Sequence, residues 1–234
     1  MSRPFDAAIF DLFGTLVPEF PREEFHASVR AAARTLGCDE DAFLEGWTST
    51  AIERQTGRFA DVADNVRAIV EALGDEPPGA EALDTALAPR RAMYERWFHP
   101  RVGALETLRA LRDRGYPVGL ISMCAPDAPA LWRASPLAPL VGVTVFSSES
   151  GLRKPDAAIY QTCAAALGIE PSRCLYCGDG SYGELSGAEA VGMKAFEVRD
   201  PEVDPAEQLR PEAEEWSGAH VEDLRELLVY FPAR

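Results

Sequence analysis

After Pro100 the chain alternates between short apolar runs and segments with helical spacing, and this alternation restricts its fold more than any other feature. The apolar runs predict strands over 118–122, 143–147, 174–178 and 194–198. The segments around them predict helices over 103–114, 127–133, 154–168, 183–191 and 219–229. Strands that alternate with helices build a parallel sheet covered on both faces. The sequence therefore predicts an α/β fold with a doubly wound, Rossmann-like parallel sheet.

A further strand is predicted far earlier in the chain, over the buried-looking run Ala7–Phe10, which ends at Asp11. Between this strand and Pro100 no strand pattern occurs. Helical spacing instead covers 21–36, 40–55, 60–73 and 80–97, with breaks at glycine or proline. We therefore expect a core domain formed by residues 1–17 and 99–234, with an all-helical cap domain over 18–98 inserted after the first strand.

The charge of the chain limits its partners. Of 234 residues, 23 are Lys or Arg and 38 are Asp or Glu, so the formal net charge is −15. Nucleic acids and anionic lipids attract basic surfaces, so neither is an expected partner. No apolar run approaches the ~20 residues of a membrane span, and an acidic residue comes too early for a signal peptide. We expect a cytoplasmic monomer or homodimer that acts on a small molecule.

The five cysteines do not predict a disulfide framework, because their number is odd and the chain is not short. Cys174 and Cys177 have the spacing of a redox or metal motif. They lie within a predicted strand, however, and none of the three histidines lies near them in the sequence. Buried structural cysteines are therefore expected.

Polar residues follow three of the predicted strands. Asp11, Ser122 and Asp179 stand where these strands end, and Lys154 begins a predicted helix beyond a fourth, with Pro155 in its first turn. Ligands of such sheets bind outside the carboxyl ends of the strands. The four side chains should therefore meet in one crevice, with the helical insertion above it as a lid. Lys154 is conspicuous because the chain has only two lysines among its 23 basic residues.

The chemistry of these residues favours phosphoryl transfer. Asp11, backed by Gly14 and Thr15 in a tight loop, can act as a nucleophile. Asp179, together with Glu184 five positions later, offers the oxygen ligands that Mg²⁺ prefers. The Ser122 hydroxyl and the Lys154 ammonium could each bind a phosphoryl oxygen. In-line phosphoryl transfer depends mainly on such positioning and charge neutralisation.

Four short motifs, in this order along almost the whole chain, resemble those of the haloacid dehalogenase (HAD) superfamily with a helical C1-type cap. They are Phe10-Asp11-Leu12-Phe13-Gly14-Thr15-Leu16, Leu120-Ile121-Ser122, Lys154-Pro155-Asp156, and Gly178-Asp179 with Glu184. The resemblance implies that Asp11 is the nucleophile. It also implies magnesium ligands, namely Asp11, the backbone carbonyl of Phe13, Asp179 and, directly or through water, Glu184. Ser122 and Lys154 would bind the transferring group.

One position departs from the phosphatases of this superfamily. They carry a second Asp two residues after the nucleophile as general acid and base, whereas this chain has Phe13. A lost general acid–base group typically costs about 10²–10⁴-fold in rate. Dehalogenases of the superfamily have an aromatic residue there, but they lack the acid of the metal site and have an Asn where this chain has Met123. The chain retains Asp179 and Glu184.

The cap region departs from both reactions. Dehalogenases use a cap arginine, and Thr48 stands in its place here. Arg54 and Arg58 are the candidate replacements, because the intervening turn resembles the cap loop that faces the site in relatives, although the abundance of arginine favours solvent exposure for both. Arg58, Thr15 and Met123 join Ser122 and Lys154 as candidate substrate-binding residues. Phosphonatases need a cap lysine, and both lysines lie outside the cap.

Three functions stay open. The favoured one is a magnesium-dependent phosphatase or phosphotransferase that acts on a small phosphorylated metabolite through an aspartyl-phosphate intermediate. Its motivation is the intact set of Asp11, Asp179 and Lys154. The alternatives are a metal-independent 2-haloacid dehalogenase, which Phe13 favours, and a catalytically weak binding domain that has kept the site and lost the acid.

Overall fold

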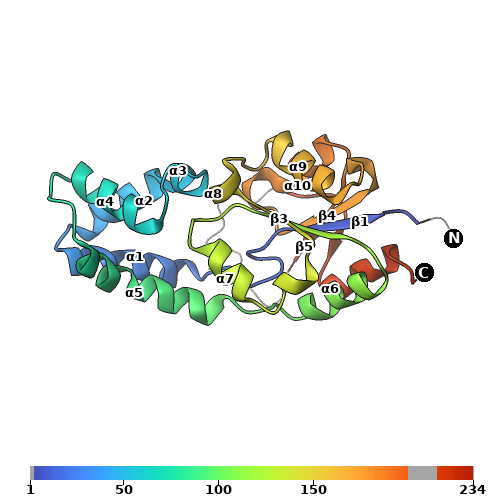
Figure 1. The fold of residues 1–234 in the computed structure, drawn as a ribbon, viewed down its shortest axis with the longest axis horizontal. Helices are drawn as coiled ribbons and strands as arrows, with labels where there is room; N and C mark the ends of the chain where they lie inside the picture. Colours follow the sequence, from blue (N-terminus) through green and yellow to red (C-terminus); the bar gives the residue numbers. More distant parts are fainter. Residues whose placement is uncertain (1–2, 200–214, 234) are drawn as a thin grey trace.

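A computed structural model describes residues 3–199 and 215–233, and its centre is a parallel sheet (Figure 1). Within these residues the sheet has six strands in the order β3-β2-β1-β4-β5-β6, all parallel to their neighbours. The strands are β1 (Ala7–Phe10), β2 (Val118–Ser122), β3 (Val143–Phe146), β4 (Cys174–Gly178), β5 (Lys194–Val198) and β6 (His220–Val221). The predicted doubly wound α/β fold is confirmed.

Strand β1 lies in the middle of the sheet, although it comes first in the chain. Ala8 pairs with Val118 of β2 on one side and with Leu175 of β4 on the other. Every residue of β1, β2 and β4 is buried, as expected for strands covered on both faces. Asp11, which follows β1, is therefore flanked by the carboxyl ends of two neighbouring strands.

Helices cover the two faces of the sheet (Figure 1). On one face α9 (Ala157–Leu167) and α10 (Glu184–Ala190) pack against the strands, and on the other α6 (Ala104–Asp113) and α7 (Ala128–Ala134) do so. A short helix, α8 (Ser147–Ser150), follows β3. Each face has its own apolar cluster, so the core of this part of the protein is two layers of side chains separated by the sheet.

Two predicted helices differ in the structure. Helix α9 begins at Ala157 with Asp156 as its N-cap residue, so Lys154 and Pro155 precede the helix and Pro155 does not lie in its first turn. The segment 219–229 is not an α-helix. His220 and Val221 pair with β5, and a 3₁₀ helix over Leu224–Tyr230 follows. His220 and Val221 pair with the open edge of the sheet, so they are not available to an α-helix. The three-residue spacing of the buried Val221, Leu224 and Leu227 also suits a 3₁₀ helix.

Residues 22–97 form helices only, as predicted. We call these five helices the cap helices. They are α1 (Arg22–Leu36), α2 (Glu40–Ser49), α3 (Ala51–Gln55), α4 (Val62–Ala72) and α5 (Ala80–Trp97). Figure 1 shows them at the opposite end of the molecule from the two termini. They enclose a separate apolar cluster that includes Val29, Phe43 and Ile69. The domain boundaries at residues 18 and 98 stay a prediction.

Local signals in the sequence explain where the cap helices begin and end. Helix α1 ends at Gly37, whose φ of +76° is a conformation that favours glycine. The Asp39 side chain then accepts hydrogen bonds from the first backbone amides of α2, and Asp61 does the same for α4. The predicted helix over 40–55 is interrupted at Thr50, which separates α2 from α3.

Helix α3 and the turn after it bring the cap helices against the sheet domain. The Gln55 Nε2 donates a hydrogen bond to the Tyr182 hydroxyl at 2.9 Å. Gly57 lies so near α8 that an added Cβ would stand 2.9 Å from the Ser148 carbonyl oxygen. The insertion is therefore held over the carboxyl ends of the strands.

Two further predictions concern the cysteines and membranes. All five cysteines are free thiols, and Cys174 and Cys177 are buried in β4, which confirms the expected burial of this pair. Among the described residues, none of the helices has the length and apolar character needed to span a bilayer.

Candidate functional site

Lys154 connects two carboxylates at the carboxyl edge of the sheet. Its Nζ lies 2.5 Å from Asp11 Oδ1 and 2.5 Å from Glu184 Oε2. All three side chains are buried. The sheet topology explains the contact, because Asp11 follows the central strand β1, Glu184 begins α10 after β4, and Lys154 lies in the loop before α9. Three residues predicted from separate motifs are therefore brought together.

Asp179 completes an acidic cluster with Asp11 and Glu184. One carboxylate oxygen from each of the three lies within 4.8 Å of the others. Lys154 contacts two of these three carboxylates, so within the cluster the carboxylates outnumber the ammonium group. Oxygen donors in this arrangement are those that Mg²⁺ prefers.

Two glycines let the loops approach these carboxylates. Gly14 has a φ of +77°, and an added Cβ there would stand 2.4 Å from Asp179 Oδ2. An added Cβ on Gly178 would stand 2.0 Å from Glu184 Oε1. Any larger residue would displace an acid of the cluster, so both glycines are fixed by the site rather than by a turn alone.

Hydrogen bonds fix the two carboxylates that follow β4. Glu184 Oε2 accepts from the Tyr176 hydroxyl at 2.6 Å, and Oε1 accepts from the backbone amide of Gly180 at 3.0 Å. The Asp179 carboxylate accepts from the amide and the hydroxyl of Ser181. Tyr176 was not predicted as a site residue. Its signal in the sequence is weak, namely a phenol inside an otherwise apolar central strand.

The environment shifts the pKa values of the cluster. Burial raises the pKa of the Asp11 carboxyl well above its ordinary value. The Lys154 ammonium opposes this shift, while the Glu184 and Asp179 charges add to it. Burial alone would lower the pKa of Lys154, but the Asp11 and Glu184 carboxylates raise it. A divalent cation in the cluster would add positive charge and lower the pKa of the Asp11 carboxyl.

Two predicted hydroxyl groups, those of Thr15 and Ser122, are buried near the ends of β1 and β2. Within the described part of the chain, neither hydroxyl oxygen has a hydrogen-bond partner. An unpaired buried hydroxyl is costly, so both are suited to a bound group. Met123 lines the cavity described next, and its sulfur accepts a hydrogen bond from the Lys154 backbone amide at 3.4 Å.

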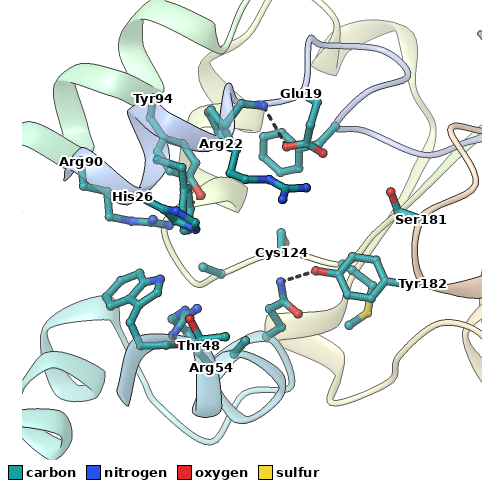
Figure 2. A pocket seen from close by; sticks show the side chains of 18 of the residues that line it. Glu19, Arg22, His26, Thr48, Arg54, Arg90, Tyr94, Cys124, Ser181 and Tyr182 are labelled. Atoms are coloured by element: carbon teal, nitrogen blue, oxygen red, sulfur yellow. Dashed lines mark hydrogen bonds between the residues drawn. The ribbon is translucent and has the colours of Figure 1, made fainter. Parts of the chain in front are cut away.

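A cavity of about 390 Å³ lies between the cap helices and the sheet domain, and Asp11 is part of its wall (Figure 2). Its volume is in the range of small-molecule sites. Aromatic side chains make up much of the lining, namely Phe13, Phe20, Phe25, Trp47, Tyr94 and Tyr182. The cavity therefore offers an apolar chamber that opens onto the candidate nucleophile.

Phe13, at the position where phosphatases of the family carry an acid, packs among these aromatic side chains. Its ring centroid lies 5.1 Å from that of Phe20, and it contacts Tyr94 and Phe98 edge-on. The phenyl ring thus belongs to an aromatic cluster that joins the first loop to the cap helices. No group at this position can transfer a proton.

The structure separates the two cap arginines. Arg54 is buried, at 4% exposure, and lines the cavity, although solvent exposure was favoured for it. Arg58 is exposed, pairs with Glu53 and does not line the cavity. Helix α3 explains the difference, because it directs Arg54 toward Trp47 and Asn65, whereas Arg58 lies beyond the helix end. Thr48, at the place of the dehalogenase arginine, also lines the cavity.

Several residues of the cavity wall have no recognisable signal in the sequence. They include Arg22, Arg90, Trp47, Tyr94 and Tyr182. The first four come from helices whose pattern indicates only an amphipathic segment, and Tyr182 lies in the loop between Asp179 and Glu184. Tyr182 has one structural mark, a φ of +58° that is unusual for a residue other than glycine.

The parallel sheet, the inserted helices and the buried Asp–Lys–Glu cluster define a hydrolase of the HAD type. The family model for haloacid dehalogenase-like hydrolases matches residues 5–192. The chain therefore belongs to the haloacid dehalogenase-like hydrolase family.

Relatives within the family catalyse different reactions. The chain is 29% identical over 168 residues to a phosphoserine phosphatase of Thermus thermophilus, a match that covers 70% of this chain and 62% of that relative. It is 25% identical over 217 residues to (S)-2-haloacid dehalogenase 4A of Burkholderia cepacia, covering 88% and 87%. A crystal structure of a HAD family hydrolase from Deinococcus radiodurans, with bound phosphate and sodium, has a TM-score of 0.61, 26% identity and full coverage of both chains. Similarity thus fixes the family and not the reaction.

Proposed function

We propose that this protein is a magnesium-dependent hydrolase of small phosphate monoesters, with Asp11 as the nucleophile. The observation that carries the proposal is the buried cluster of three carboxylates, two of which contact Lys154, beside the cavity that Asp11 lines. A phosphatase needs this excess of negative charge to hold a cation, whereas a metal-independent reaction does not.

The reaction would proceed in two displacements. A carboxylate oxygen of Asp11 attacks phosphorus, the bond between phosphorus and the ester oxygen breaks, and the alcohol leaves after taking a proton from water. Water then attacks the phosphorus of the aspartyl phosphate. The bond to Asp11 breaks, which releases inorganic phosphate and a proton and regenerates the carboxylate.

The remaining site residues would position the phosphoryl group. Lys154 would hold one of its oxygens as well as Asp11, and the unpaired hydroxyls of Ser122 and Thr15 would donate to the others. The Asp11 and Asp179 carboxylates, the Phe13 carbonyl and Glu184 would hold Mg²⁺. When bound, the ion would neutralise charge on the transferring group.

Phe13 limits the substrates of such an enzyme. Among the described residues that line the cavity, Glu19 is the carboxylic acid besides Asp11, and its Oε1 accepts a hydrogen bond from the Phe20 amide at 2.8 Å. With no acid at position 13, the leaving alcohol receives little help. We therefore expect faster turnover of esters whose alcohol is acidic, such as aryl phosphates, than of alkyl phosphates.

Phe13 and the Burkholderia cepacia relative favour a second candidate function, metal-independent hydrolysis of 2-haloacids. Here Asp11 would attack the carbon that bears the halogen and expel halide. Water would then hydrolyse the resulting ester to a 2-hydroxyacid, a proton and the free carboxylate. In this reaction Asp179 and Glu184 would need no metal.

The two functions are separated by one set of assays on the wild type, Asp11→Asn and the control Asp113→Asn, which changes an exposed carboxylate paired with Arg112. Phosphate release from phenyl phosphate is measured with Mg²⁺ and with EDTA, and halide release from 2-chloropropionate under the same conditions. We expect phosphate release that EDTA and Asp11→Asn abolish and that Asp113→Asn leaves unchanged.

The other outcomes have clear meanings. Halide release that persists in EDTA, without phosphate release, would replace the proposal by the dehalogenase. Turnover that survives in Asp11→Asn would exclude Asp11 as the nucleophile. If neither product forms while phosphate still binds, the protein is a binding domain that has lost catalysis.

A further inference from the structure

Among the residues that the structure describes, Arg54 of the cavity wall is a buried cation without an acidic partner. Its side chain is almost fully buried, yet no carboxylate of the described residues lies within ion-pair distance of it. Its Cζ stacks 4.0 Å from the centre of the Trp47 ring. Buried charges are normally paired, because removing them from water is costly. An unpaired arginine beside a cavity indicates that a ligand supplies the missing anion.

The hydrogen bonds of Arg54 leave one edge of the guanidinium unused. Nη1 donates to the Trp47 carbonyl at 3.0 Å and to Asn65 Oδ1 at 2.7 Å, with a longer contact to Thr50 Oγ1. Nε and Nη2 make no hydrogen bond in the described structure, and neither is among its fully buried polar atoms. The protein therefore anchors Arg54 by one nitrogen and leaves the Nε–Nη2 edge beside the cavity.

Arg90, in the same wall, shows what this edge binds. Its Nε and Nη2 donate to the two carboxylate oxygens of Asp127, at 2.7 and 3.1 Å. This is a bidentate arginine–carboxylate pair. Arg54 has the same edge available and lacks the aspartate.

The wall around Arg54 contains further buried polar atoms that have no partner among the described residues, namely two donors and the acceptor Gln55 Oε1. Arg90 Nη1 and Trp47 Nε1 are buried and have no acceptor in the described structure. Arg22 and His26 of α1 lie across the cavity (Figure 2). Burial lowers the pKa of Arg54 to about 10, and the charge of Arg90 adds to this effect. An anion in the cavity would offset both the burial of the Arg54 charge and its repulsion by Arg90.

We propose that Arg54 binds a carboxylate of the substrate, so that the substrate is a phosphate monoester with a carboxylate at its other end. This inference rests on the proposed function, since Asp11 receives the phosphoryl group at the core end of the same cavity. The planar Nε–Nη2 edge matches a carboxylate, and the aromatic walls between the two ends suit a compact apolar body. Arg54 is then a specificity-determining residue.

Helix α3 fixes the distance between the two ends. The residue after Arg54 is Gln55, whose amide donates to the hydroxyl of Tyr182 in the loop after Asp179. The residue next to the arginine that would bind the carboxylate is therefore hydrogen-bonded to the loop after Asp179.

Two pairs of probes test the proposal on the full-length protein with Mg²⁺. The first pair, 4-carboxyphenyl phosphate and phenyl phosphate, is compared by kcat/KM. The second pair, 4-carboxybenzylphosphonate and benzylphosphonate, is not hydrolysed and is compared by calorimetric Kd. We expect the wild type to prefer the carboxylated member of each pair about 10- to 100-fold, as a charged hydrogen-bonded pair allows.

The variants then assign this preference. Arg54→Gln should remove it, chiefly through KM and Kd, while leaving the uncarboxylated probes within about threefold, which is under 1 kcal/mol. Arg54→Lys keeps the positive charge but loses the planar edge, so it should retain only part of the preference for the carboxylated probes. This variant tests the proposal if Arg54→Gln does not fold. The control Arg91→Gln changes an exposed cap arginine paired with Asp84 and should preserve the preference.

Each result that contradicts the proposal is distinct. A wild type that binds both phosphonates equally overturns it without any variant. Equal losses for both members in Arg54→Gln assign Arg54 a structural role only. Tighter binding of 4-phosphonobenzylphosphonate than of the carboxylated probe would replace the carboxylate by a second phosphate. If no ester is hydrolysed but the Arg54-dependent binding preference is present, the proposed function fails and the carboxylate site stands.

Discussion

The two ends of the cavity hold charge in opposite ways. At the sheet end, the carboxylates of Asp11, Asp179 and Glu184 outnumber Lys154. At the cap end arginines line the wall, and Arg54 has no acidic partner among the described residues. An acidic cluster attracts a cation, and a guanidinium attracts an anion. A substrate that binds both ends needs one anionic group over the cation site and another at the arginine.

The ends also differ in how their side chains are held. The sheet-end residues lie at strand ends, at a helix start or in a loop, and hydrogen bonds from neighbouring residues fix the carboxylates of Glu184 and Asp179. The cap-end arginines lie on helices, and stacking on aromatic rings adds to their hydrogen bonds, as with Arg54 on Trp47. The strand ends therefore position the side chains of the sheet end, whereas helix packing and aromatic rings position those of the cap end.

The largest effect should come from removing the cation of the sheet end. Lys154→Met leaves Asp11 and Glu184 buried without their common partner. Breaking a buried pair in this way costs about 3–5 kcal/mol of the free energy of unfolding, and turnover should fall about 10³-fold. Urea unfolding and phosphate release measure the two losses.

The control for this variant is Lys194→Met, which changes the other lysine of the chain, an exposed residue paired with Glu189. It should alter neither quantity by more than a small amount, because surface ion pairs contribute at most about 1 kcal/mol. If Lys154→Met unfolds at the wild-type urea concentration, the sheet end is not held by charge, and the contrast with the cap end disappears.

A smaller effect is expected from closing the gap between the first loop and Asp179. Gly14→Ala places a Cβ 2.4 Å from Asp179 Oδ2, so the acid must move. A displacement of this size can lower kcat by up to about 10²-fold. Gly37→Ala is the matched control, because Gly37 has nearly the same φ of +76° but no atom within 4 Å of an added Cβ.

Both glycine variants should lose stability from the strained backbone, about 1–2 kcal/mol each. Only Gly14→Ala should lose activity and affinity for Mg²⁺, which kinetics over a range of Mg²⁺ concentrations would measure. Equal activity of the two variants would show that the position of Asp179 does not govern the reaction.

An acid at position 13, between the two ends of the cavity, should raise kcat/KM for alkyl phosphates about tenfold. This gain is below the usual range for general acid–base catalysis, because the surrounding side chains pack against a phenyl ring. Phe13→Asp should raise kcat/KM for an alkyl phosphate relative to phenyl phosphate. It should also reduce stability, since Phe13 packs against Phe20, Tyr94 and Phe98. Phe13→Leu removes the ring without adding an acid, and an equal gain in that variant would assign the effect to space rather than proton transfer.

The smallest effect concerns the contact that joins the two ends. Tyr182→Phe removes the acceptor of the Gln55 hydrogen bond, whose net contribution is about 0.5–1.5 kcal/mol. KM for a carboxylated ester should rise about two- to tenfold while kcat changes little. Gln55→Ala should do the same, and the double variant should lose no more than either single one. Additive losses would mean that the two side chains act separately.

The sequence alone determined the sheet end. Short strands buried on both faces appear as continuous apolar runs with clear ends, so the residues at those ends, Asp11, Ser122 and Asp179, could be placed at one edge of a parallel sheet. Lys154 could be placed beside them because it begins the segment after a strand. The insertion was also predictable, since its helical period interrupts the strand–helix alternation.

The tertiary structure decided the cap end. A helical pattern shows that a face is buried but not which neighbour it meets, so Arg54 and Arg58 could not be told apart until α3 was seen packed against Trp47 and Asn65. The same reason applies to the segment 219–229, where an open sheet edge captured His220 and Val221. The spacing of residues in the sequence shows which side chains stand at the ends of strands. Only the packing of distant segments shows which side chains lie across the cavity from them.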